Sequence, residues 1–147
     1  AIPLPIAGHM LLQSLTIRQG SAASLRTAQF RLYEDVTAGN VELPAVAGTN
    51  GTFSFTPGAA DERTANISTT PTYIGPGLYW LLIRNTSATQ TFVLRAMAAS
   101  ELTGNVARTK NIGSLADPLD ISGGWAGITT MPLVRLNGRV IGESAAF

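Results

Sequence analysis

The chain has 147 residues, a formal net charge of +1, 13% charged residues and no cysteine. The length fits a single domain. The balance of charges argues against electrostatic capture of nucleic acid, and the lack of cysteine excludes a disulfide scaffold or a thiolate metal site. The charged fraction is about half that of a typical domain. We therefore expect part of the surface to contact other protein, as in an assembly subunit.

The first twelve residues predict an extended arm. Residues 1–8 include Pro3 and Pro5 and no polar side chain, and proline disfavours helix both at its own position and at the preceding one. We divide the chain into an extended N-terminal arm over residues 1–12 and a single β-sandwich domain over residues 13–147. The arm is expected to reach onto a neighbouring subunit through its apolar side chains, which are Ile2, Leu4, Ile6 and Leu11.

Short alternating runs follow the arm. Leu15 and Ile17 alternate with polar residues, and the run 28–33 repeats the pattern, which is typical of antiparallel strands with one buried face. Residues 57–72 are rich in Gly, Ala, Thr and charges and predict a loop. Further strands are expected at 41–46, 52–56, 91–97, 106–112, 133–136 and 139–141, the last two on either side of Asn137-Gly138.

The most apolar stretch predicts a central strand. Residues 78–83 are apolar at both parities, so both faces of this strand should be covered, with the rings of Tyr79 and Trp80 buried on opposite faces. The run is far shorter than the roughly 20 residues of a membrane-spanning helix, and no membrane partner is expected. About eight or nine short strands predict an all-β fold, an antiparallel β-sandwich of the jelly-roll type.

No residue pattern indicates catalysis. His9 is the sole histidine, so a Ser–His–Asp triad would depend on it. We interpret it instead as a surface or interface residue, and it leaves too few ligands for a zinc site. The adjacent pairs Glu34-Asp35 and Asp61-Glu62 would point to opposite faces of a strand, unlike the facing carboxylates of glycoside hydrolysis. We expect a protein that is not an enzyme and uses no cofactor and no metal.

Trp125 is the candidate for contact with a ligand. It lies among glycines in the stretch 123–127, where an exposed ring could stack on a sugar. Packing or a protein interface is the other interpretation of this residue, because a buried aromatic ring removes a large apolar area from water. The loop expected at residues 61–72 is a second candidate for contact with a host-surface glycan.

Several segments resemble a module that recurs in virion proteins of tailed bacteriophages. They are Leu15-Thr16-Ile17, the Gly-Ser-Ala turn that begins at Gly20, Phe30-Arg31-Leu32-Tyr33, and the Pro-Gly-Leu-Tyr-Trp stretch of residues 76–80. The resemblance covers about residues 11–97. The module is found in tail fibres, receptor-binding tips and capsid-decorating proteins, so the resemblance implies a jelly-roll domain in a virion.

Among these classes, a capsid decoration (cement) protein fits the length best, because a single sandwich leaves no room for a fibre shaft. The resemblance implies a structural protein that forms a homotrimer, binds the major capsid protein or other virion subunits, and lies on the virion surface after synthesis in the bacterial host cytoplasm. The alternative is a tail-fibre or receptor-binding module that recognises host-surface glycan. Nucleic acid is not an expected partner.

Overall fold

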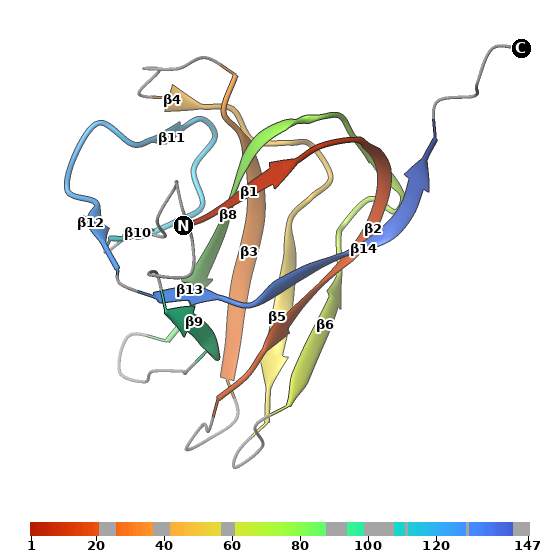
Figure 1. The fold of residues 1–147 in the computed structure, drawn as a ribbon. Coiled ribbons are helices and arrows are strands. Elements are labelled where there is room, and N and C mark those ends of the chain that lie inside the picture. Colours follow the sequence, from red (N-terminus) through yellow and green to blue (C-terminus); the bar gives the residue numbers. More distant parts are fainter. Residues whose placement is uncertain are drawn as a thin grey trace, which may run out of the picture.

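A computed structural model describes residues 1–20, 26–36, 42–56, 61–87, 94–98, 108–110, 112–128 and 130–142. These residues form strands, turns and bends and contain no helix, which confirms the all-β prediction. No helix in this part of the chain is therefore long and apolar enough to cross a membrane. The strands pair antiparallel in two facing sheets (Figure 1), so the antiparallel β-sandwich is confirmed, while the jelly-roll topology stays a prediction.

The first sheet, sheet I, has the strand order β1-β8-β3-β5. Its members are β1 (Ile2–Ile6), β8 (Gly77–Asn85), β3 (Arg26–Glu34) and β5 (Gly51–Phe55). The second sheet, sheet II, has the order β14-β2-β6, and β7 also pairs with β2. Its members are β14 (Val134–Ile141), β2 (His9–Arg18), β6 (Glu62–Asn66) and β7 (Thr72–Ile74).

Among the described residues, three short antiparallel pairs lie outside the two sheets. They are β4 (Glu42–Leu43) with β11 (Leu119–Asp120), β10 (Arg108–Thr109) with β12 (Ala126–Gly127), and β9 (Ala96–Ala98) with β13 (Thr130–Pro132). Several expected strands are therefore present but shorter than predicted, and residues 41, 91–93, 106, 107 and 111 of those predictions lie outside the described residues.

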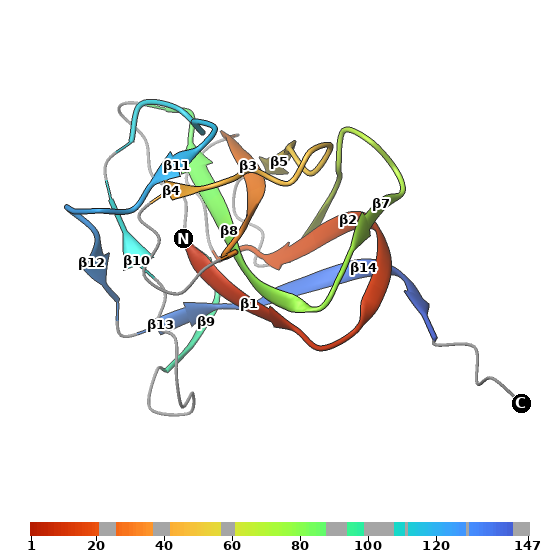
Figure 2. The same ribbon diagram turned by 90° about the horizontal axis from the view of Figure 1, so that it is seen from above.

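As far as the structure describes the chain, apolar clusters cover both faces of sheet I but only the inner face of sheet II. Tyr79 and Leu81 of β8 join the core between the sheets. Trp80 and Leu82 point to the opposite face, into a second apolar cluster with Leu119 of β11. Figure 2 shows β4 and β11 beside β8, away from β14. The prediction of a central strand with one buried ring on each face is confirmed.

A β-bulge shapes sheet II. Asn137 of β14 lies opposite Ser14, but the next residue, Gly138, lies opposite Leu12. Gln13 is therefore an extra residue on β2, and such an insertion changes which residues face the core. Inward-facing residues accordingly switch from even to odd numbers along β2, and they are Met10, Leu12, Leu15 and Ile17.

Gly138 is required at this bulge. A Cβ added to it would lie 2.1 Å from the carbonyl oxygen of Leu11, which only the lack of a side chain avoids. Strand β14 passes through this position without a break from Val134 to Ile141. The expectation of two runs on either side of Asn137-Gly138 is thus wrong, because the dipeptide lies opposite a bulge within a single strand.

Residues 62–66 also differ from expectation, because they form β6 and not part of a loop. This strand pairs with β2 over five residues, from Asn66 opposite Ser14 to Glu62 opposite Arg18. Its one apolar residue, Ala65, faces the core. A strand with a single small inward side chain carries little periodic signal in the sequence.

The first twelve residues do not form a separate arm. Residues 2–6 are extended, as expected, but they pair along their whole length with β8, from Ile2 opposite Leu81 to Ile6 opposite Gly77. Strand β2 then begins at His9. The boundary at residue 12 is therefore wrong: the segment forms the edge strand of sheet I and part of sheet II.

Candidate functional surfaces

The apolar residues assigned to the arm are used mostly within the chain. Ile2 is 5% exposed and belongs to the core, and Leu4 and Ile6 pack against the same core. Leu11 lies on β2, opposite Tyr73 of β7 and on the other face from Met10 and Leu12. The expectation that these four side chains form one contact with a neighbouring subunit is wrong, because β8 and the core bind three of them.

The prolines of β1 close the outer edge of sheet I. The backbone of Ala1 exchanges two hydrogen bonds with Arg108: the terminal amine donates to the Arg108 carbonyl at 2.6 Å, and the Arg108 N–H donates to the Ala1 carbonyl at 2.9 Å. Backbone N–H and C=O groups point to alternate sides along a strand. The backbone groups of Pro3 and Pro5 therefore point to the same side as those of Ala1, away from β8. Proline has no N–H to donate, so this edge offers no donor at either position.

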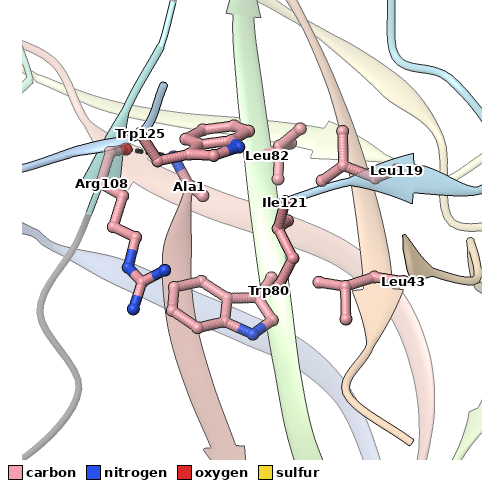
Figure 3. A pocket seen from close by; sticks show the side chains of 8 residues that line it. All are labelled: Ala1, Leu43, Trp80, Leu82, Arg108, Leu119, Ile121 and Trp125. Atoms are coloured by element: carbon pink, nitrogen blue, oxygen red, sulfur yellow. Dashed lines mark hydrogen bonds between the residues drawn. The ribbon is translucent and has the colours of Figure 1, made fainter. Parts of the chain in front are cut away.

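Trp125 lies in an apolar pocket over the outer face of β8, drawn in Figure 3. The lining residues are Ala1, Leu43, Trp80, Leu82, Arg108, Leu119, Ile121 and Trp125. The cavity is about 10 Å³, which is room for roughly one water molecule. The pocket is thus a packed cluster and does not accommodate a sugar ring.

Polar groups fix both rings of this pocket. The Trp80 Nε1 donates to the Asp35 carboxylate at 3.2 Å, and the Arg108 guanidinium lies 5.4 Å from the Trp80 ring centroid. The Trp125 Nε1 donates to the Asp120 carbonyl at 3.4 Å, and the Lys110 ammonium lies 5.7 Å from its ring. These contacts favour the packing interpretation of Trp125.

The amine of Ala1 is enclosed beside this cluster. Burial lowers its pKa to about 6 from the usual value near 8, because the charged form loses hydration in an apolar environment. The enclosed amine donates its hydrogen bond to the Arg108 carbonyl and so holds the start of β1 in place.

The two carboxylate pairs do not converge on a common point. Asp35 accepts the Trp80 hydrogen bond, while the Glu62 carboxylate forms an ion pair at 3.0 Å with Arg135. The Asp61 carboxylate accepts the backbone N–H of Glu62 at 2.7 Å. Within the described ranges, no three His, Cys, Asp or Glu side chains come together as metal ligands.

A polar groove crosses the outer face of sheet I at β3 and β5. Its volume is about 380 Å³, within the range of small-molecule sites. The lining residues are Gln29, Phe30, Arg31, Asn50, Gly51, Thr52 and Leu115. These residues come from three distant segments, so the groove could not be recognised from any one motif.

Internal hydrogen bonds leave this groove rich in donors. The Gln29 side-chain oxygen accepts from Arg84 at 3.0 Å, and the Asn50 side-chain oxygen accepts from Ser68 at 2.7 Å. The amide NH₂ groups of Gln29 and Asn50 then remain as donors. Arg31, which pairs with Asp117 at 3.2 Å, adds a cation. The lining therefore suits a ligand rich in oxygen acceptors.

The second candidate surface is the free side of β14, which we call the β14 edge (Val134–Ile141). In the part of the chain that the structure describes, β14 pairs with β2 on one side and with no strand on the other. Val140 is 74% exposed and Ile141 is 37% exposed. The nearby Tyr73 is 55% exposed, and its hydroxyl is hydrogen-bonded to Nδ1 of His9, which lies opposite Ile141. Exposed apolar side chains therefore gather where sheet II ends.

No protein-family model, curated protein or solved structure matches this chain.

Proposed function

We propose that the protein is a non-enzymatic structural subunit of a tailed-phage virion that acts by adhering to other protein. The observation that carries this proposal is the β14 edge, where an unpaired strand and exposed apolar side chains coincide. Exposed strand edges are templates for pairing with another chain. The motifs that resemble virion modules supply the assignment to a phage particle.

The proposed role is capsid decoration. A subunit that bridges neighbouring capsid proteins buries apolar surface, which contributes roughly 25 cal/mol per Å². That contribution is lost when the shell expands or bursts, so bound subunits stabilise it. The major capsid protein and further copies of this chain are the proposed partners.

The test uses phage heads that lack the protein. We expect the purified chain to co-sediment with such heads saturably and to raise the temperature at which they release DNA. Heads that bind none of the chain, or bind it without any gain in heat resistance, would overturn the proposal. Val140→Glu places a charge at the β14 edge and should weaken the co-sedimentation, while Val36→Glu alters an exposed apolar residue elsewhere and should leave it unchanged.

The alternative function is recognition of a host-surface glycan by a tail-fibre or receptor-binding module. The donor-rich groove favours it, since sugars present many oxygen acceptors to amide and guanidinium donors. Binding on a glycan array should then fall with Asn50→Ala or Gln29→Ala. It should persist with Trp125→Ala, because Trp125 does not line this groove. No binding to any glycan on the array would exclude this function.

A further inference from the structure

We propose that a second copy of the chain pairs with the β14 edge, antiparallel and edge to edge, so that the two copies of sheet II form one continuous sheet. This inference rests on the proposed adhesive function and names the partner and contact strand. The contact is two-fold, so it differs from the homotrimer implied by the resemblance to virion proteins.

The outer backbone groups of the β14 edge are available for pairing with another strand. Sequence 134–141 contains no proline, so every backbone N–H of β14 is present. The opposite situation holds at β1, where Pro3 and Pro5 face the outer edge of sheet I. Proteins protect edges in that way when pairing must be avoided, and β14 lacks this protection.

Val140 faces the core side of sheet II, but the described part of the chain leaves it exposed. Val140 lies opposite Met10, so both side chains point toward the core side of sheet II. Met10 is 9% exposed, but Val140 is 74% exposed. The apolar layer beneath sheet II is therefore incomplete at its β14 edge. A further strand added there would continue the layer and cover Val140.

The alternation of side chains along β14 limits the register in which two copies of the strand can pair. Val134, Leu136, Gly138 and Val140 face the core side, since they lie opposite Ile17, Leu15, Leu12 and Met10. Two copies that keep their core sides together must pair residues of equal parity. Placing the two-fold axis at Gly138 meets this condition. The pairs are then Leu136 with Val140 of the second copy, Asn137 with Arg139 of the second copy, and Arg135 with Ile141 of the second copy.

Charge selects this register over its neighbours. With the axis at Gly138, neither Arg135 nor Arg139 lies opposite an arginine. With the axis at Asn137, Arg135 would lie opposite Arg139 of the second copy, and with the axis at Arg139 that residue would lie opposite its own copy. Like charges directly opposite destabilise a strand pair. Of these three registers, the one centred on Gly138 has no arginine opposite another and places Leu136 of the second copy against the exposed Val140. This fit of the strand to its own copy is why a second copy is the inferred occupant.

Sedimentation equilibrium of the full chain tests the pairing. We expect a concentration-dependent dimer whose dissociation constant rises at least tenfold in Val140→Glu. Because Val140 is exposed, this variant should keep the unfolding curve of the unmodified chain. Val36→Glu is the matched control, as an exposed valine outside β14, and should leave the dimer unchanged. A chain that stays monomeric at the highest concentration, or equal dissociation constants for all three proteins, would overturn the inference.

Crosslinking tests the register. The chain has no cysteine, so an Arg135→Cys/Ile141→Cys double variant should form disulfide-linked dimers with oxidised glutathione. Ile141→Cys alone should not, because residue 141 lies three residues from the axis and about 20 Å from its own copy at 3.4 Å per residue. Equal crosslinking of the two variants would overturn the register. A monomer that still binds phage heads would refute only this inference, whereas a dimer that binds none would refute the proposed function.

Discussion

Strands β1 and β14 are both edge strands, and they treat their outer edges in opposite ways. Strand β1 carries Pro3 and Pro5 on its outer side, and Ala1, the residue before the strand, exchanges two hydrogen bonds with Arg108. Strand β14 carries no proline and leaves Val140 and Ile141 exposed. The comparison teaches that the outer edge of β1 is closed to further strands, whereas in the part of the chain that the structure describes the outer edge of β14 is open.

The largest expected effect comes from the closed edge. Ile2→Ala should lower the free energy of unfolding by about 3 kcal/mol, since it removes a buried side chain of that size. Leu11→Ala, at a half-buried position on the outer face of sheet II, should cost less than about 1 kcal/mol. Urea unfolding of the two variants measures the difference. Equal small effects would mean that residues 1–12 behave as a free arm after all.

The next effect concerns how β14 is held to the sheet. Gly138→Ala should destabilise the protein by about 2 kcal/mol, because its methyl group would overlap the Leu11 carbonyl and force the backbone apart. Gly142→Ala is the control, since a Cβ there meets nothing within 4 Å. Thermal unfolding of both variants checks this, and an unaltered Gly138→Ala protein would contradict the bulge.

A smaller effect is expected in the pH dependence of stability, through the amine of Ala1 at the start of β1. The pKa of the Ala1 amine is about 6 in the folded protein and near 8 when exposed. The unfolded chain therefore binds more protons between these values, so stability should fall as the pH is lowered from 8 to 6, by about 1–2 kcal/mol. Acetylation of the amine should abolish this component of the pH dependence. A pH slope that acetylation leaves intact would contradict the enclosed amine.

The smallest expected effect on stability comes from a variant in which the outer edge of β1 is opened like that of β14. Replacing Pro3 and Pro5 together with valine restores two outward N–H groups on β1 and should change the free energy of unfolding by less than about 1 kcal/mol. The variant should nevertheless form larger species in sedimentation velocity, because its second edge becomes available for pairing. Sedimentation identical to that of the unmodified chain would show that the prolines do not protect the edge.

The sequence predicts those parts of the fold where side chains of one kind repeat. Residues 78–83 are apolar at both parities and form the doubly covered β8, as expected. Strand β6 escaped prediction because Ala65 is its sole inward apolar residue. Pro3 and Pro5 are equally compatible with an arm and with an edge strand, and pairing with β8, which no local pattern encodes, decides between them.

The candidate surfaces were harder to predict than the fold. The sequence leaves Trp125 open to packing or to contact with a sugar, and the contacts with Lys110 and Asp120 favour packing. The groove at Gln29 and Asn50 depends on segments that only folding brings together. The sequence feature that indicates the β14 edge is a proline-free alternating run that ends in Val140-Ile141.

The most direct test of an open and a closed edge is amide hydrogen exchange as a function of protein concentration. Pairing through β14 predicts that protection of residues 134–141 rises between dilute and concentrated samples, while protection of residues 2–6 stays constant. Protection that is independent of concentration in both strands, or that rises in β1 and not in β14, would contradict the account.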